Sequence, residues 1–340
     1  MKLANMIRER ISNLQGEIGV YFYDIKQDNS FFVGNCDVFP SLGIAKLVLL
    51  IEVFRQVEEK VIRLDDTYTL DKKPPFAIPE NEYEATVGVL DFLHKGMELT
   101  IEDLVYLMIV ISDNSAFNIL LSIVGMEQVN DTMKKLGLTK TKIRCMLFEW
   151  DEIDPEKDNY HSVREIGSLL RRLYKGQLIS TAASEQMLRI LSYHQRRDIL
   201  SGFSDRGISV AQQTGFDITA LHDAAIVMTE NPFILCMSTN KISAKRAEGI
   251  MKDIAFMCGE EAQKQKYNVL KKERKSKKRT KKRRDLNQTL FLLYKDEHFA
   301  AVSESHKLIL HRANMPARKF ARVEIPGFIL HTVAFILNCG

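Results

Sequence analysis

Short segments with the hydrophobic patterns of β-strands, either an alternation with a period of two or a brief apolar run, lie near both ends of the first 260 residues. The segments with these patterns are residues 17–25, 30–33, 207–214, 222–228 and 233–238. The turn-forming run Gln27-Asp28-Asn29 separates the first two segments, so we expect them to form a hairpin. Two strands come early in the chain and three come late, so one sheet would have to be assembled from both ends.

The intervening sequence has helical periodicity instead. The predicted helices there cover residues 43–60, 100–111, 116–124, 127–136, 162–175 and 184–194, and two more cover residues 1–15 and 243–265. Thr100 and Ser162 each stand three residues before an acidic residue, a pattern typical of a helix N-terminus. The order of the elements predicts an α+β fold, in which a five-stranded antiparallel sheet built from both chain ends carries an inserted all-helical subdomain, with a cleft where the two meet.

The charge distribution divides the chain further. Residues 264–284 contain 13 Lys or Arg and one acidic residue, which leaves 35 basic and 43 acidic residues in the rest of the chain. The net charge of +4 therefore comes from one tract attached to an acidic body. We predict a domain over residues 1–262, with sheet parts 1–40 and 200–262 and a helical part 41–199, then a basic linker over 263–285 and a C-terminal extension over 286–340.

Several classes of protein are disfavoured by what the sequence contains. The five cysteines are widely spaced without a C-x-x-C pair, so we expect reduced thiols, with no zinc site and no cofactor. No run reaches the ~20 apolar residues that span a bilayer, and the first 15 residues have no signal-peptide pattern. These features favour a cytoplasmic protein without a transmembrane segment.

Lys46 stands in the first turn of an otherwise apolar predicted helix, Ile44-Ala45-Lys46-Leu47-Val48-Leu49. Burying a lysine among such residues is costly unless the amine is paired or functional. A serine three residues earlier would share its helix face and transfer a proton to it, but that position is Gly43. We expect Ser41, two residues before Gly43, to be the N-cap.

Three short motifs follow one another in a fixed order: Gly43-Ile44-Ala45-Lys46, Ser112-Asp113-Asn114 and Gln213-Thr214-Gly215, with 69 and 101 residues between their first members. Their order, their spacing and their places at a helix start, an inter-helix turn and a strand resemble class A β-lactamases and the related penicillin-binding transpeptidases. The resemblance covers about residues 1–262. It implies the fold described above and recognition of a small amide or lactam-like ligand.

The resemblance also implies a role for each matching residue. Lys46 would act as, or assist, the general base, and Ser112 would relay its proton to the leaving nitrogen. Asn114 would hold the side-chain amide of the substrate and also Lys46. Thr214 would bind the substrate carboxylate, Gly215 would let the substrate lie along the strand, and Gln213 would keep a hydrogen-bonding group where the family has a lysine. The backbone N–H groups of Gly43 and Phe216 would form an oxyanion hole.

Three departures from the family pattern argue against ordinary turnover. Gly43 lacks the nucleophilic hydroxyl, Gln213 replaces a lysine, and no residue clearly matches the deacylating glutamate. Loss of the nucleophile in a serine hydrolase costs on the order of 10⁶ in turnover, so catalytic impairment is expected. Two alternatives stay open: a hydrolase that is still active on lactams, and an inert scaffold that makes weak contacts with polyanions through residues 264–284.

Overall fold

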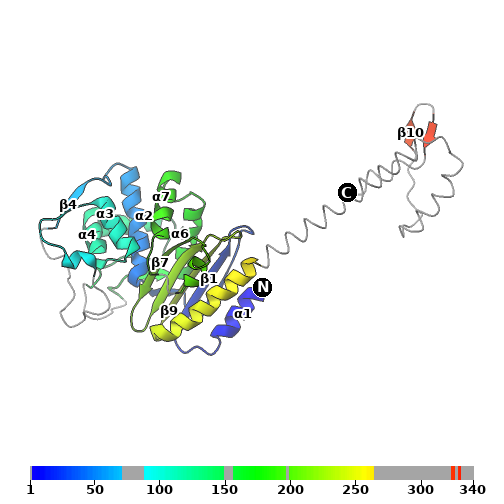
Figure 1. Ribbon diagram of the computed structural model, residues 1–340, viewed down its shortest axis with the longest axis horizontal. Helices are drawn as coiled ribbons and strands as arrows, with labels where there is room; N and C mark the ends of the chain where they lie inside the picture. Colours follow the sequence, from blue (N-terminus) through cyan, green and yellow to red (C-terminus); the bar gives the residue numbers. More distant parts are fainter. Residues whose placement is uncertain are drawn as a thin grey trace. The chain divides into compact units, whose positions relative to one another are not determined.

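Five antiparallel strands form the central sheet of the computed structural model, which describes residues 2–70, 88–148, 156–196 and 199–263 and the backbone of 323–325 and 328–330 (Figure 1). In sheet order the strands are β2 (Asn29–Gly34), β1 (Glu17–Asp24), β9 (Phe233–Asn240), β8 (Leu221–Val227) and β7 (Val210–Phe216). Strand β1 pairs with β9, for example Gly19 with Ser238. This pairing joins the two ends of the domain and confirms the predicted sheet.

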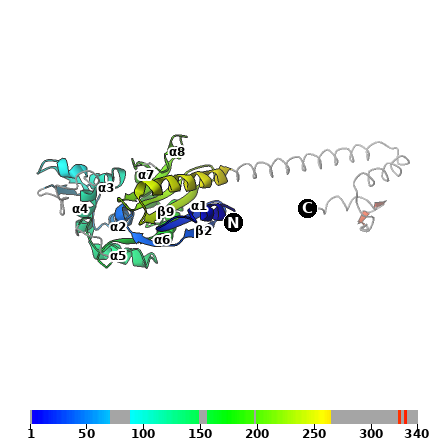
Figure 2. The same ribbon diagram turned by 90° about the horizontal axis from the view of Figure 1, so that it is seen from below.

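Both faces of the sheet are covered, which is why β1, β9, β8 and β7 are almost wholly buried, whereas the edge strand β2 is largely exposed. On one face, helix α1 (Lys2–Ile11) and the helix over residues 244–263, yellow in Figures 1 and 2, pack on alternate residues of β1 such as Val20 and Phe22. The helical part packs on the other face, where Tyr23 joins the larger core. Burial of apolar residues from both ends of the chain therefore stabilises the sheet.

The helical part follows the predicted periodicity. Its main elements are α2 (Ala45–Glu58), α3 (Ile101–Val110), α4 (Asn114–Val124), α5 (Met126–Lys135), α6 (Val163–Tyr174) and α7 (Thr181–Ser192). Short elements connect them: β3 (Val38–Pro40), η1 (Leu42–Ile44), β4 (Thr67–Thr69), η2 (Val89–Phe92), β5 (Glu98–Thr100), β6 (Tyr160–Ser162) and α8 (Ser201–Ser204).

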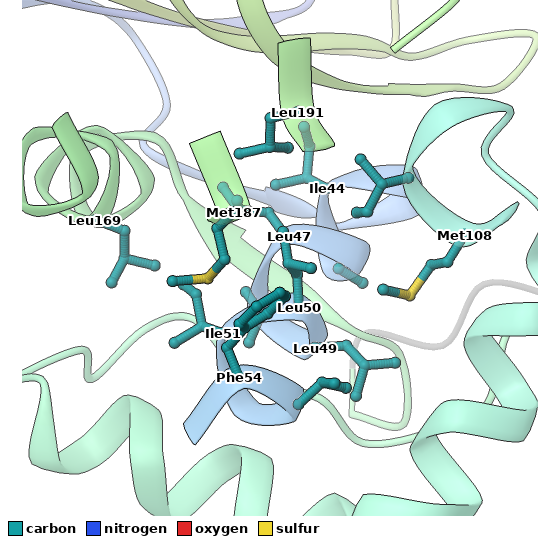
Figure 3. Close-up of a cluster of buried hydrophobic side chains, with 14 of the residues drawn as sticks. Ile44, Leu47, Leu49, Leu50, Ile51, Phe54, Met108, Leu169, Met187 and Leu191 are labelled. Carbon is teal, nitrogen blue, oxygen red and sulfur yellow. The ribbon is translucent and has the colours of Figure 1, made fainter. Parts of the chain in front are cut away.

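Helix α2 is at the centre of this part and is buried on nearly all sides. Leu47, Leu50 and Phe54 lie in one apolar cluster with Met187 of α7 and Met108 of α3 (Figure 3). A helix that is apolar around its circumference is stable only when other elements enclose it. The position of Lys46 at the start of α2 is therefore fixed by the core of the helical part.

The predicted helix starts are confirmed at Thr100 and Ser162, and Ser41 occupies the predicted N-cap position, but of the 3₁₀ turn η1. Thr100 and Asp103 form a reciprocal capping box, and the Ser162 hydroxyl accepts a hydrogen bond from the Glu165 N–H. Ser41 has helical backbone angles, and its side chain makes no capping bond. The chain enters through the 3₁₀ turn η1, and α2 begins only at Ala45.

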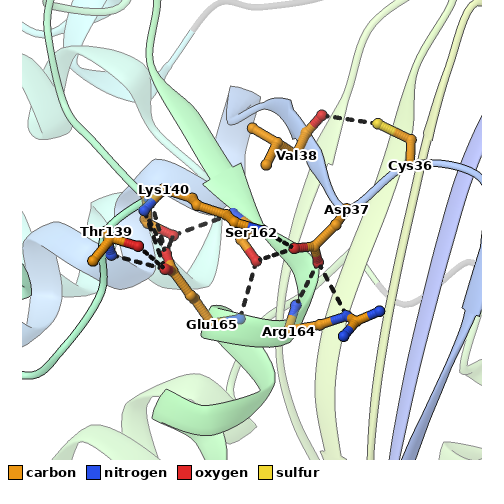
Figure 4. A network of polar contacts seen from close by, with 9 residues as sticks. Cys36, Asp37, Val38, Thr139, Lys140, Ser162, Arg164 and Glu165 are labelled. Carbon is orange, nitrogen blue, oxygen red and sulfur yellow. Dashed lines mark hydrogen bonds and ion pairs between the residues drawn. The ribbon is translucent and has the colours of Figure 1, made fainter.

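Glu165 is part of a polar network that ties α6 to the segment after α5 (Figure 4). Its carboxylate accepts hydrogen bonds from the N–H groups of Thr139, Lys140 and Thr141 and from the Thr141 hydroxyl. Burial raises the pKa of this carboxyl, but these hydrogen bonds outweigh burial and the pKa is lowered. The Glu165 carboxylate therefore anchors the segment after α5, and the side-chain capping bond of α6 is made by Ser162 alone.

The chain divides into two compact units, Met1–Val269 and Leu270–Gly340. In the second unit, β10 (Val323–Ile325) and β11 (Phe328–Leu330) form an antiparallel pair. The predicted linker over 263–285, beyond its first residue, lies outside the described residues, as does most of the predicted extension over 286–340. Among the described residues no helix has the length and apolar character needed to cross a membrane.

Candidate functional site

The side chain of Lys46 meets the turn between α3 and α4. Its Nζ lies 2.7 Å from the Ser112 carbonyl oxygen, 2.8 Å from Ser112 Oγ and 2.5 Å from Asn114 Oδ1. The sequence separation is 66 and 68 residues, so only the tertiary fold brings the three together. The structure thus places Lys46, Ser112 and Asn114 in one hydrogen-bonded cluster.

Lys46 is 1% exposed, and this burial has a chemical consequence. Removal from water disfavours the ammonium form and lowers the pKa of Lys46 to about 7, although the nearby Asp113 carboxylate acts in the opposite direction. An amine with a pKa near 7 is present in both forms at neutral pH. It can therefore accept a proton from a neighbouring hydroxyl, as a general base must.

The Ser112–Asn114 turn is strained and firmly anchored. Ser112 has a φ of 61°, a conformation that costs a non-glycine residue about 1–2 kcal/mol. Asp113 is fully buried: its carboxylate accepts hydrogen bonds from the N–H groups of Ala116, in the first turn of α4, and Leu90, in η2. These bonds hold η2 and the start of α4 together, and with them the residues that contact Lys46.

Gly43 lies against the backbone of edge strand β7. A Cβ atom built on Gly43 would lie 2.2 Å from the Thr214 carbonyl oxygen and 3.2 Å from Gly215 Cα. The converse also holds, since a Cβ on Gly215 would lie 2.9 Å from the Gly43 nitrogen. Both glycines are required by this close approach, and the space that a nucleophile's Cβ would fill is occupied by β7.

Thr214 has a partner that the sequence did not reveal. Its Oγ1 lies 2.9 Å from His194 Nε2, and His194 Nδ1 lies 2.6 Å from the Ile109 carbonyl oxygen. If neutral His194 donates a hydrogen bond from Nδ1 to that carbonyl, its Nε2 accepts a hydrogen bond from the Thr214 hydroxyl. No motif or spacing in the sequence marks His194 as a partner of Thr214.

The other residues of the third motif have separate surroundings. Gln213 is buried, and its Nε2 donates to the Thr214 carbonyl oxygen at 3.2 Å, while its Oε1 accepts no hydrogen bond from any described residue. At Phe216, the Arg196 guanidinium carbon lies 3.3 Å from the ring centroid. Arg196 is a second residue near the site that the sequence analysis missed.

His222 supports this region from within the sheet. It pairs with Gly215 in the β7–β8 register, and its Nε2 donates to the Pro40 carbonyl oxygen, three residues before Gly43. Burial lowers its pKa to about 4, although hydrogen bonds to backbone groups oppose the shift. A neutral, buried His222 therefore has a packing role and holds the Pro40 carbonyl in place.

The predicted residues therefore form two groups on either side of the start of α2. Lys46 joins Ser112 and Asn114, and Gly43 contacts Thr214 and Gly215. His194 links the groups through Ile109, at the end of α3, and Thr214 of β7. In the described part of the chain, no three His, Cys, Asp or Glu side chains gather as metal ligands would.

Comparison with protein families and solved structures gives concordant results. The β-lactamase enzyme family matches residues 2–261. A β-lactamase from Sphaerobacter thermophilus is 24% identical, with a TM-score of 0.67 over 76% of this chain and 96% of that one. PBP-A is 23% identical, with a TM-score of 0.69 over 78% and 97% of the two chains. A mutant of PBP-A has been solved as an acyl-enzyme complex with penicillin G, with 23% identity and a TM-score of 0.68 over 77% and 97%. No curated protein matches.

Proposed function

The chain belongs to the β-lactamase enzyme family, and from this membership we propose that its site binds a β-lactam or a related amide or ester but is impaired in the family's acyl-enzyme chemistry. The observation that carries the proposal is the contact at Gly43. The residue offers no hydroxyl, and any Cβ there would meet the Thr214 carbonyl oxygen at 2.2 Å. Attack on a ligand carbonyl from position 43 is therefore blocked by both chemistry and space.

The cluster around Lys46 supports retained recognition. An amine with three acceptors within 2.8 Å and a pKa of about 7 is costly to maintain in a core that needs only apolar packing. The strain at Ser112 adds to that cost. Perturbed pKa values and backbone strain accumulate where a site is used.

Gln213 changes what the site would recognise. A lysine would attract a carboxylate, whereas Gln213 has a buried Oε1 that accepts no hydrogen bond from any described residue. Buried acceptors are normally satisfied, and a ligand N–H would satisfy this one. We therefore favour ligands with an amide donor near the scissile carbonyl over ligands recognised chiefly by negative charge.

Replacing Asn114 with alanine is expected to weaken binding of a fluorescent penicillin about tenfold, because one hydrogen bond to the ligand amide would be lost. Fluorescence anisotropy with displacement by unlabelled penicillin measures the dissociation constant. Asn5→Ala, which removes an exposed asparagine on α1, is the matched control and should bind like the parent chain. If the parent chain takes up no fluorescent penicillin in a saturable way, whether displaceable or retained on the chain, the proposal is wrong.

A second candidate function is suggested by residues 264–284, with 13 basic residues and one acid. Such a tract would bind RNA or anionic lipid by releasing counterions, so the affinity would fall steeply with salt. Deleting residues 264–284 should abolish binding to a single-stranded RNA in 50 mM salt. Binding that persists after the deletion, or that ignores salt, would exclude this candidate.

A further inference from the structure

We propose that Ser112, paired with Lys46, is a nucleophile that takes the acyl group in place of the missing residue at position 43. This inference rests on the proposed function, since it assigns a reaction to the same ligand in the same site. It differs from the family's use of this residue, in which the serine only relays a proton. The geometry of the two side chains carries the inference.

Ser112 Oγ lies 2.8 Å from Lys46 Nζ, which is the distance over which an amine removes a hydroxyl proton. With the amine neutral, two of its hydrogen atoms can serve the Ser112 carbonyl and Asn114 Oδ1, and its lone pair faces the Ser112 hydroxyl. All three contacts are then satisfied by the form of lysine that acts as a base.

Solvent exposure favours the Ser112 hydroxyl over the Lys46 amine as the group that attacks a ligand. Lys46 is 1% exposed, whereas Ser112 is partly exposed. A ligand can therefore approach Ser112, whereas the Lys46 amine is shielded from direct contact. The pair His161–Ser238, with 2.8 Å between Nε2 and Oγ, has similar geometry, but both residues are almost fully buried, so no ligand reaches it.

The backbone also distinguishes Ser112. It follows directly after the last turn of α3 with a φ of 61°, a place where glycine is the usual residue. A serine at this position has a strained backbone because it has a Cβ, and such strain is characteristic of residues at functional sites. Other hydroxyls near the site do not combine these features: Ser41 is buried, and its Oγ bonds to no described residue.

The reaction is balanced without any further reagent. Ser112 Oγ forms a bond to the lactam carbonyl carbon, and its proton passes to Lys46 Nζ. The carbon–nitrogen bond of the ring breaks, and the ammonium of Lys46 returns the proton to the leaving nitrogen. The product is a Ser112 ester that retains every atom of the opened lactam.

The test is the intact mass of the full chain after incubation with penicillin G, followed by peptide mapping of the ester. We expect a gain of one whole ligand mass on the peptide that contains Ser112, at a rate that rises as the pH passes through about 7. Ser112→Ala should gain no mass, and Ser112→Cys should regain a label. Ser122→Ala, which alters an exposed serine near the C-terminal end of α4, should be labelled like the parent.

The outcomes separate this inference from the proposed function. If the parent chain binds the fluorescent penicillin reversibly but is never labelled, or is labelled at another residue, Ser112 is not the nucleophile and the proposed function stands. If labelling at Ser112 occurs at the same rate in Lys46→Met, the lysine is not its base. If there is neither reversible binding nor labelling, the proposed function fails as well.

Discussion

Raising the pH from 7 to 10 is expected to increase the free energy of unfolding of the parent chain by about 3 to 4 kcal/mol more than that of Lys46→Met. The pKa of Lys46 is lowered to about 7 in the folded protein, while an unfolded lysine keeps a pKa near 10.4. Between pH 7 and about pH 10.4 the lysine is mostly protonated in the unfolded state and mostly neutral in the folded state. The parent chain therefore gains stability as the pH rises through this window.

Urea denaturation of both chains at several pH values from 6 to 10 measures this difference. Methionine has a similar length and does not titrate, so the difference between the chains removes the contribution of every other titrating group. Parallel stability curves would mean that Lys46 stays fully charged at neutral pH. It would then be unable to serve as a base.

Replacing Gly43 with alanine is expected to destabilise the domain by about 1–3 kcal/mol, the usual cost of overpacking a tight contact. The added Cβ would meet the Thr214 carbonyl oxygen at 2.2 Å. The group it meets is backbone within a strand, so relief requires β7 to move. Gly43→Ser should cost at least as much, and restoring the missing serine should not by itself restore a family enzyme.

Gly249→Ala is the matched control for this substitution. Gly249 is exposed in the helix over residues 244–263, and a Cβ there would meet nothing within 4 Å. Alanine is the better helix former by about 0.5–1 kcal/mol, so the control should be unchanged or slightly more stable. Thermal unfolding of the three chains gives the comparison, and a Gly43→Ala chain as stable as the parent would contradict the close approach of β7.

The fold could be predicted from the sequence because its signals are local. The alternation in residues 17–25 and the apolar run over 233–238 marked β1 and β9, and the break at Ser112-Asp113-Asn114 separated α3 from α4. The antiparallel sheet from both chain ends then followed from the order of the elements. Ser41 is the N-cap of η1, but its side chain makes no capping bond because the backbone of Ser41 is already in a helical conformation.

The site was predictable only where side chains belong to motifs. Lys46, Ser112 and Asn114 do so, and they meet as expected. His194 and Arg196 have no such spacing, and only the packing of α7 and the following segment against β7 brings them to Thr214 and Phe216. The contact at Gly43 was also invisible, because a sequence can show that a hydroxyl is missing but not that a backbone oxygen fills its place.

Isothermal titration of penicillin G into the full chain distinguishes retained recognition from turnover and from lack of recognition, because each gives a different heat signal. We expect a saturable single-site binding curve without a steady heat of hydrolysis. Continuous heat proportional to enzyme concentration would show that the site still turns over lactams. No heat above dilution, at concentrations up to the millimolar range, would show that the site does not recognise them.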